Sequence, residues 1–164
     1  EESHMLDLKS QISGWVKERV QLAQATWLNT DSLLHGLKWT QAQAGEVRLV
    51  VAPQWLGRSP SRYTGSLILA CELAVEEALR LEERMRGISL LFMGSQSEFL
   101  KAQRGTCEIR FKMSVDEMEE LRLQVLRSKT FSRDFLLTLW SHDEVQLGSV
   151  TLQVRLQLQP YLTA

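Results

Sequence analysis

The sequence predicts an α+β protein in which an antiparallel sheet wraps around one central helix. Three observations support this fold class. The run Ser66–Leu81 is helical and largely apolar, a hairpin precedes it, and four strand-like segments with one helical interruption follow it. Strands that follow a helix as a group favour an antiparallel sheet over alternating parallel units. An amphipathic segment near the N-terminus adds a further helix.

The first expected element is that N-terminal helix, over Leu6–Leu28, because apolar residues recur there at helical spacing. Residues Glu1–His4 stand ahead of Met5, and we interpret them as a remnant before the natural start. We expect one domain over residues 5–164, since the chain contains no linker, internal repeat or low-complexity segment.

A hairpin is expected next. Leu37–Gln41 and Glu46–Ala52 have strand character, and Ala44-Gly45 lies between them as a turn. The following segment, Pro53–Gly65, holds two prolines and two glycines and therefore predicts a loop that leads into the central helix.

The central helix is predicted over Ser66–Leu81, which contains neither Gly nor Pro. Its apolar residues cover about half of the circumference on a 3.6-residue period. Glu76, Glu77 and Arg80 fall on the other half, and Glu72 lies on the border between the two. A carboxylate at the edge of an apolar face is the chemically notable feature of this helix.

The rest of the chain alternates as strands do, with one helix between them. The predicted strands are Ile88–Met93, Thr106–Met113, Phe131–Ser141 and Val150–Leu158. The last of them alternates apolar and polar residues throughout and is the clearest strand pattern in the chain. Ser114–Arg127 breaks the pattern: Ser114 and Glu117 have the spacing of a capping box, which predicts a short helix.

Composition excludes several classes of function. The net charge of -1 gives no electrostatic basis for binding nucleic acid. No run approaches the roughly 18 uncharged apolar residues that a membrane span needs. Cys71 and Cys107 have no ligand-like spacing, so we interpret them as reduced core residues of a cytoplasmic protein. No His, Cys and Asp pattern predicts a metal site, and no cofactor is expected.

Three segments resemble those of a known superfamily. They are SRYTGSLILACELA (Ser61–Ala74), EFLKAQRGTCEIRF (Glu98–Phe111) and WSHDEVQLGSVTLQVRL (Trp140–Leu156). Their order and pattern are similar to those of the hotdog fold, most of all to its poorly characterised thioesterase-like branch, over residues 30–159.

This resemblance implies a homodimer or higher homo-oligomer with acyl-thioester sites near the dimer interface. The implied substrates are acyl groups on coenzyme A or acyl carrier protein, and the implied activity is hydrolysis. By position, Glu72 is the candidate carboxylate that activates water or attacks the carbonyl. Gly65 and Ser66 are candidate oxyanion donors, because free N–H groups at a helix N-terminus stabilise a developing oxyanion.

Further candidates surround these residues. Arg62 and Tyr63 stand where many members of the superfamily have Asn or His, and either could orient a thioester carbonyl or a coenzyme A phosphate. Tyr63 is the second candidate catalytic residue, Trp55 a candidate for lining the acyl pocket, and Glu76 an alternative to Glu72. Because Arg62 and Tyr63 depart from the common pattern, a non-catalytic acyl-binding or scaffold protein with this fold stays open.

Overall fold

The computed structural model describes residues 37–51, 60–100 and 106–159, without the side chains of residues 60–64. The predicted N-terminal helix over Leu6–Leu28 lies outside the described residues, as does Trp55.

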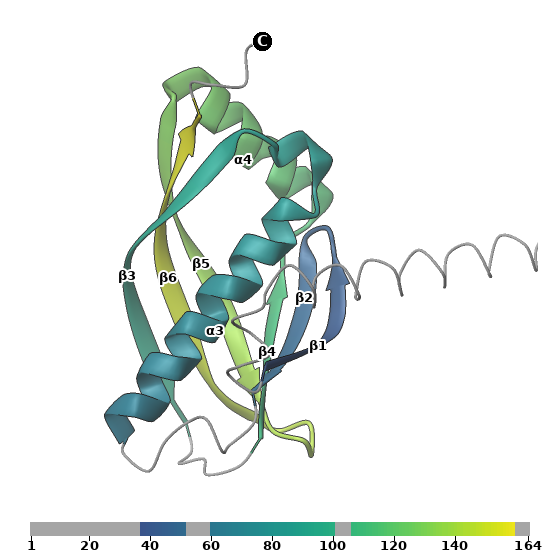
Figure 1. The fold of residues 1–164 in the computed structure, drawn as a ribbon, viewed down its shortest axis with the longest axis vertical. Coiled ribbons are helices and arrows are strands. Elements are labelled where there is room, and N and C mark those ends of the chain that lie inside the picture. The colour runs from purple at the N-terminus through teal and green to yellow at the C-terminus, as the bar shows by residue number, and fades with distance from the viewer. Residues whose placement is uncertain (1–36, 52–59, 101–105, 160–164) are drawn as a thin grey trace, which may run out of the picture.

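A six-stranded sheet forms the body of the molecule, with the strand order β1-β2-β4-β5-β6-β3 (Figure 1). Every neighbouring pair is antiparallel, which confirms the predicted α+β fold class. The strands are β1 (Leu37–Gln43), β2 (Glu46–Val51), β3 (Ile88–Phe99), β4 (Cys107–Lys112), β5 (Thr130–Trp140) and β6 (Gln146–Leu158).

One long helix, α3 (Pro60–Arg80), lies across one face of this sheet, as predicted for a central helix (Figure 1). It contacts five of the strands, from β1 at one edge to β3 at the other. The side chains that it buries against the sheet share one helical stripe: Leu67, Ala70, Cys71, Ala74, Val75, Ala78 and Leu79. Burial of this stripe against the inward-facing strand residues forms the hydrophobic core.

A second helix, α4 (Val115–Ser128), packs over one end of the sheet, next to the short 3-10 turn η2 (Glu83–Met85). The predicted capping box at its start is confirmed. The Ser114 hydroxyl accepts from the Glu117 N–H at 3.2 Å, and the Glu117 carboxylate accepts from the Ser114 N–H at 2.8 Å. These bonds satisfy backbone donors that the first turn of a helix leaves unpaired.

Several element boundaries differ from the prediction. The segment up to Gly65 was predicted as loop, but α3 already begins at Pro60. Proline suits the first position of a helix because that position needs no N–H donor, and burial outweighs the helix-weakening effect of a single glycine. Strand β6 also begins earlier than predicted, at Gln146 instead of Val150. Strand β3 continues to Phe99, with an irregularity after Phe92 where its register against β6 shifts.

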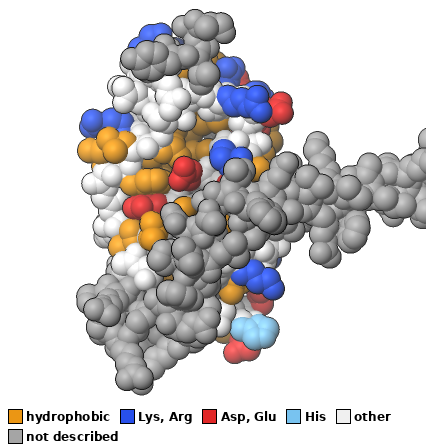
Figure 2. Space-filling view, in the orientation of Figure 1, with side chains coloured by type: hydrophobic (Ala, Val, Ile, Leu, Met, Phe, Trp, Pro, Cys, Tyr) orange, Lys and Arg blue, Asp and Glu red, His pale blue; other side chains and the backbone are white. Residues whose placement is uncertain are grey.

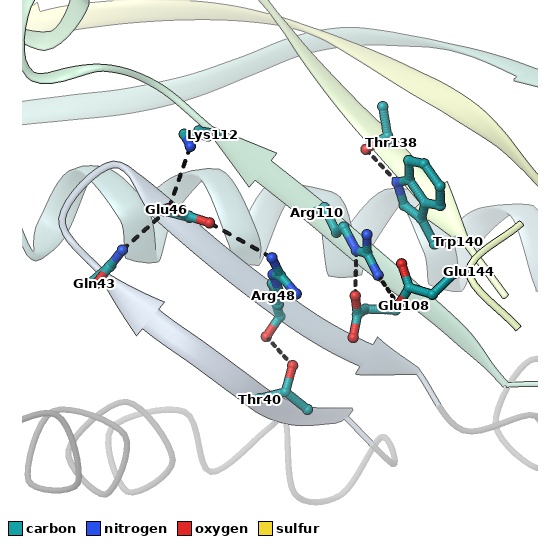
Figure 3. A network of polar contacts seen from close by, with 10 residues as sticks. All are labelled: Thr40, Gln43, Glu46, Arg48, Glu108, Arg110, Lys112, Thr138, Trp140 and Glu144. Carbon is teal, nitrogen blue, oxygen red and sulfur yellow. Dashed lines mark hydrogen bonds and ion pairs between the residues drawn. The ribbon is translucent and has the colours of Figure 1, made fainter. Parts of the chain in front are cut away.

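On the sheet face turned away from α3, the polar side chains of β4 and its neighbours pair with one another (Figure 3). Arg110 lies over the Trp140 ring at 4.6 Å, pairs with Glu144 at 2.6 Å and contacts Glu108. Glu46, nearer the hairpin, lies 3.9 Å from the ammonium of Lys112. The Arg110 hydrogen bond holds the pKa of Glu144 below its usual value. Paired charges of this kind belong to a solvated surface, so this face supplies no candidate catalytic group.

Both cysteines lie in the core as free thiols, as predicted. Burial raises the pKa of Cys107 to about 11 and also raises the pKa of Cys71. Both thiols therefore stay protonated at neutral pH, and neither has the character of a nucleophile.

Candidate functional site

Glu72 occupies the position that the sequence predicted, on the border of the buried stripe of α3. It is partly buried, and it makes no hydrogen bond or ion pair with any residue in the part of the chain that the structure describes. Its pKa is raised, first because burial disfavours the charged form and second because the Glu76 carboxylate lies nearby. A half-buried carboxylate with a raised pKa can accept a proton closer to neutral pH than an ordinary glutamate can.

The next glutamate on this flank, Glu76, is exposed and faces a cavity of about 350 Å³. This cavity lies where the C-terminal half of α3 meets the connection into β3. Its lining consists of Glu76, Leu79, Arg80, Met85, Arg86, Gly87, Ile88, Ser89, Leu90 and Gln159. Glu72 does not line it, although Glu72 lies only one helical turn away.

Glu77 contradicts the prediction that it lies on the solvated half of the helix. It is 2% exposed, and its carboxylate accepts two hydrogen bonds from Arg80, at 2.8 Å from Nε and 2.6 Å from Nη2. The hydrogen bond to Glu77 is the main cause of the raised pKa of Arg80. Arg80 therefore pairs with Glu77 and not with Glu72. The three-residue spacing of Glu77 and Arg80 is the sequence feature from which this pair could have been predicted.

The predicted oxyanion donors, Gly65 and Ser66, do not lie at the start of the helix. Gly65 and Ser66 were placed at the start of the helix, but α3 begins at Pro60, which puts both residues inside it. Only the first four N–H groups of a helix lack an intrahelical acceptor, so the N–H groups of Gly65 and Ser66 are used within the helix. Among the described residues, the free backbone donors at this end are the N–H groups of residues 61 and 62.

Arg62 and Tyr63 fall in the first turn of α3. Their side chains, and all of Trp55, lie outside the described residues. Their predicted roles in orienting the substrate and lining an acyl pocket therefore stay predictions.

Strand β3, whose first residues line the cavity, is one of the two edge strands of the described sheet. Large hydrophobic side chains are exposed on it and just beyond it: Leu91, Met93, Phe99 and Leu100. On the face that carries α3, Figure 2 shows hydrophobic side chains at the surface with acidic ones among them. An edge strand with exposed apolar side chains is a surface onto which another chain can add.

Other kinds of site find no support among the described residues. No group of three or more His, Cys, Asp or Glu side chains there could hold a metal ion. No helix in the described ranges is both long and apolar enough to cross a membrane.

A scan against family models finds no match for this chain, and a search of curated proteins finds no similar sequence. Solved structures do match it. A Pseudomonas aeruginosa protein of unknown function, described as a probable thioesterase, superposes with a TM-score of 0.74 at 12% identity, covering 86% of this chain and 95% of that one. A mutant thioesterase from the same organism gives a TM-score of 0.61 at 11% identity, with 84% and 94% covered.

This chain has the hotdog fold. A third hotdog structure, a hypothetical thioesterase from Streptococcus pneumoniae with coenzyme A, matches with a TM-score of 0.50 at 13% identity, covering 75% of this chain and 87% of that one. At these identities the likeness establishes the fold alone. Within the hotdog fold of this chain, α3 is the central helix, and Glu72 is its partly buried carboxylate without a partner among the described residues.

Proposed function

We propose that this hotdog protein is a thioesterase that hydrolyses acyl groups from coenzyme A or acyl carrier protein, with Glu72 as its catalytic carboxylate. The observation that supports this most is the state of Glu72: partly buried, with a raised pKa and no partner among the described residues. A carboxylate that only stabilised the fold would gain from a cationic partner, as Glu77 does from Arg80.

The proposed reaction uses Glu72 as a general base. Its carboxylate takes a proton from water as the water oxygen attacks the thioester carbonyl carbon. The C–S bond of the tetrahedral intermediate then breaks, the thiolate leaves, and the proton on Glu72 is available to neutralise it. Free N–H groups in the first turn of α3, rather than those of Gly65 and Ser66, are the proposed donors to the oxyanion.

The proposed carrier is coenzyme A in the first instance. The structural similarity to the Streptococcus pneumoniae protein, whose structure contains coenzyme A, supports this choice. Acyl carrier protein presents the same thioester on the same kind of pantetheine arm, so it is the second carrier to be tested.

We further propose that the protein acts as a homodimer through β3. Leu91 and Met93 are 54% and 51% exposed on this edge strand. The outer backbone groups of β3 have no neighbouring strand in the described sheet. Pairing with β3 of a second copy would satisfy those groups and bury these side chains. Light scattering on the protein and on its Leu91→Arg variant tests this: we expect a dimer that the substitution dissociates.

The activity is tested with a panel of acyl-coenzyme A and acyl carrier protein thioesters. We expect Glu72→Gln to lower kcat/KM by about 100-fold or more, because general-base catalysis contributes roughly that much. Glu120→Gln, an exposed glutamate on α4, is the matched control and leaves the rate unchanged. Equal rates for wild type and Glu72→Gln, with both folded by circular dichroism, would remove Glu72 from the mechanism.

One observation favours a second candidate function, a non-catalytic acyl-binding protein. The cavity beside α3 reaches Glu76 and Arg80, but Glu72 does not line it. For such a protein we expect no turnover of any thioester in the panel, together with an increase in Tm when an acyl-coenzyme A is added.

A further inference from the structure

The cavity at the C-terminal end of α3 begins close to the proposed catalytic carboxylate. Glu72, Glu76 and Arg80 are spaced four residues apart and so follow one flank of the helix. At a rise of about 1.5 Å per residue, Glu76 is about 6 Å and Arg80 about 12 Å beyond Glu72 along the helix axis. Glu76 and Arg80 both line the cavity. An acyl chain whose thioester lies at Glu72 would reach the cavity lining if it followed this flank of the helix for one turn.

The cavity wall combines apolar side chains with two arginines. Its apolar part consists of Leu79, Met85, Ile88 and Leu90. Its basic groups are Arg80 and Arg86. A cavity with this lining suits a ligand with a short hydrocarbon body and an anionic end.

Arg80 is held in place before any ligand arrives. Its Nε and Nη2 atoms donate to the buried Glu77 carboxylate, at 2.8 Å and 2.6 Å. A guanidinium has five N–H groups, so the remaining ones are free to donate to a second acceptor. Fixing one side of a guanidinium lowers the entropy cost of binding with the other.

Arg86 is the second positive charge in the lining, and Glu77 pairs with Arg80 and not with Arg86. Arg86 is exposed, and it makes no ion pair or side-chain hydrogen bond with any described residue. Glu76 is the one carboxylate in the lining. Its charge also acts on Arg80, whose pKa it helps to raise, so the favourable place for a ligand anion is at Arg86.

We infer that this cavity binds the far end of the acyl group and selects acyl chains that end in a carboxylate. The substrate class is then the monothioesters of short dicarboxylic acids. This inference rests on the proposed function, because it uses Glu72 to position the thioester. The phosphates of coenzyme A are the other source of an anion, and the test below distinguishes the two.

Binding to the Glu72→Gln variant tests the inference without turnover. Isothermal titration calorimetry compares adipyl-coenzyme A with hexanoyl-coenzyme A, which has the same six-carbon chain without the carboxylate. We expect adipyl-coenzyme A to bind at least about tenfold more tightly, because hydrogen bonds to charged groups contribute that much or more. Adding Arg86→Ala should abolish the preference, whereas adding Arg127→Ala, an exposed arginine on α4, should preserve it.

Several outcomes would overturn the inference. They are equal affinities for the two thioesters, a preference that survives Arg86→Ala, or binding of neither thioester. Coenzyme A alone is the third ligand: if Arg86→Ala weakens it as much as it weakens adipyl-coenzyme A, the cavity binds phosphate and not the acyl carboxylate. A different result tests the proposed function: it is wrong if the wild-type protein hydrolyses none of these thioesters.

Discussion

The two halves of α3 differ in how their outer flanks are stabilised. In the C-terminal half, Glu77 is buried and doubly hydrogen-bonded to Arg80. The N–H of Gly45, in the β1–β2 turn, also donates to the Ala78 carbonyl at 3.1 Å. In the longer N-terminal part, residues 60–72, Gly65 weakens the helix, Leu69 is 44% exposed, and Glu72 has no partner in the described residues.

This difference indicates that the C-terminal half makes more stabilising contacts, whereas the part around Glu72 leaves its outer side chains without partners among the described residues. The buried stripe runs along both halves, so both are anchored to the sheet. Only the C-terminal half adds an ion pair with a buried carboxylate and a turn whose Gly45 N–H donates to the Ala78 carbonyl. Unpaired polar groups and an exposed apolar side chain cost stability, and such costs are typical of surfaces that bind another molecule.

The largest effect is expected from breaking the ion pair of the C-terminal half. Arg80→Ala leaves the Glu77 carboxylate buried without a partner, and we expect the free energy of unfolding to fall by about 3 kcal/mol. Urea unfolding followed by circular dichroism measures this change.

The double variant Glu77→Leu, Arg80→Ala is its control. It removes the buried charge as well as its partner, so we expect it to recover most of the lost stability. If the single and double variants are equally destabilised, packing around residue 77 and not the unpaired charge is responsible.

A smaller effect of opposite sign is expected in the N-terminal half. A Cβ added at Gly65 would meet no atom of the described residues within 4 Å, apart from the adjoining backbone of the helix itself. Gly65→Ala should therefore raise the free energy of unfolding by about 1 kcal/mol, since alanine is the better helix former. If hydrolysis also falls while stability rises, then Gly65 serves the close approach of substrate to the helix. If stability falls, the helix does not continue through Gly65 as described.

Much of the fold was predictable because local patterns and tertiary structure agree. The alternation in Val150–Leu158 corresponds to β6, and the Ser114 and Glu117 pair corresponds to the cap of α4. The start of α3 was not predictable from composition. Pro60 and Gly65 are typical loop residues, yet Pro60 fits a first helical position, and tertiary burial of Leu67 and Ala70 stabilises the helix beyond its local propensity.

The candidate site was predictable in position but not in its pairing. Helical periodicity placed Glu72 on the border of the buried stripe, and the structure agrees. The same periodicity put Glu77 on the solvated side, because it does not account for an arginine three residues later that compensates a buried charge. The cavity was not foreseen at all, since its walls come from α3, the start of β3 and Gln159, which are distant in sequence.

The smallest effect concerns the junction of the two halves, where Glu76 faces both Glu72 and the cavity. Burial and Glu76 together raise the pKa of Glu72 above its ordinary value of 4.5. Hydrolysis that needs ionised Glu72 rises with pH through that pKa, so Glu76→Gln should move the rising limb of the kcat/KM profile to lower pH. The pKa read from this limb should still lie above the ordinary value for a glutamate, because burial is the larger cause of the raised pKa of Glu72.

The raised pKa of Glu72 also makes the stability of the folded protein depend on pH. A carboxyl whose pKa is higher in the folded protein binds more protons there, so its contribution to stability falls as pH rises from the unfolded to the folded pKa. Glu76→Gln lowers the pKa of Glu72 in the folded protein and therefore narrows the pH range over which stability falls. Urea unfolding at a series of pH values measures this range. Glu120→Gln, the exposed control on α4, should alter neither the rate profile nor this pH range. A rising limb that moves to higher pH in Glu76→Gln would mean that Glu76 assists the ionisation of the catalytic group instead of opposing it.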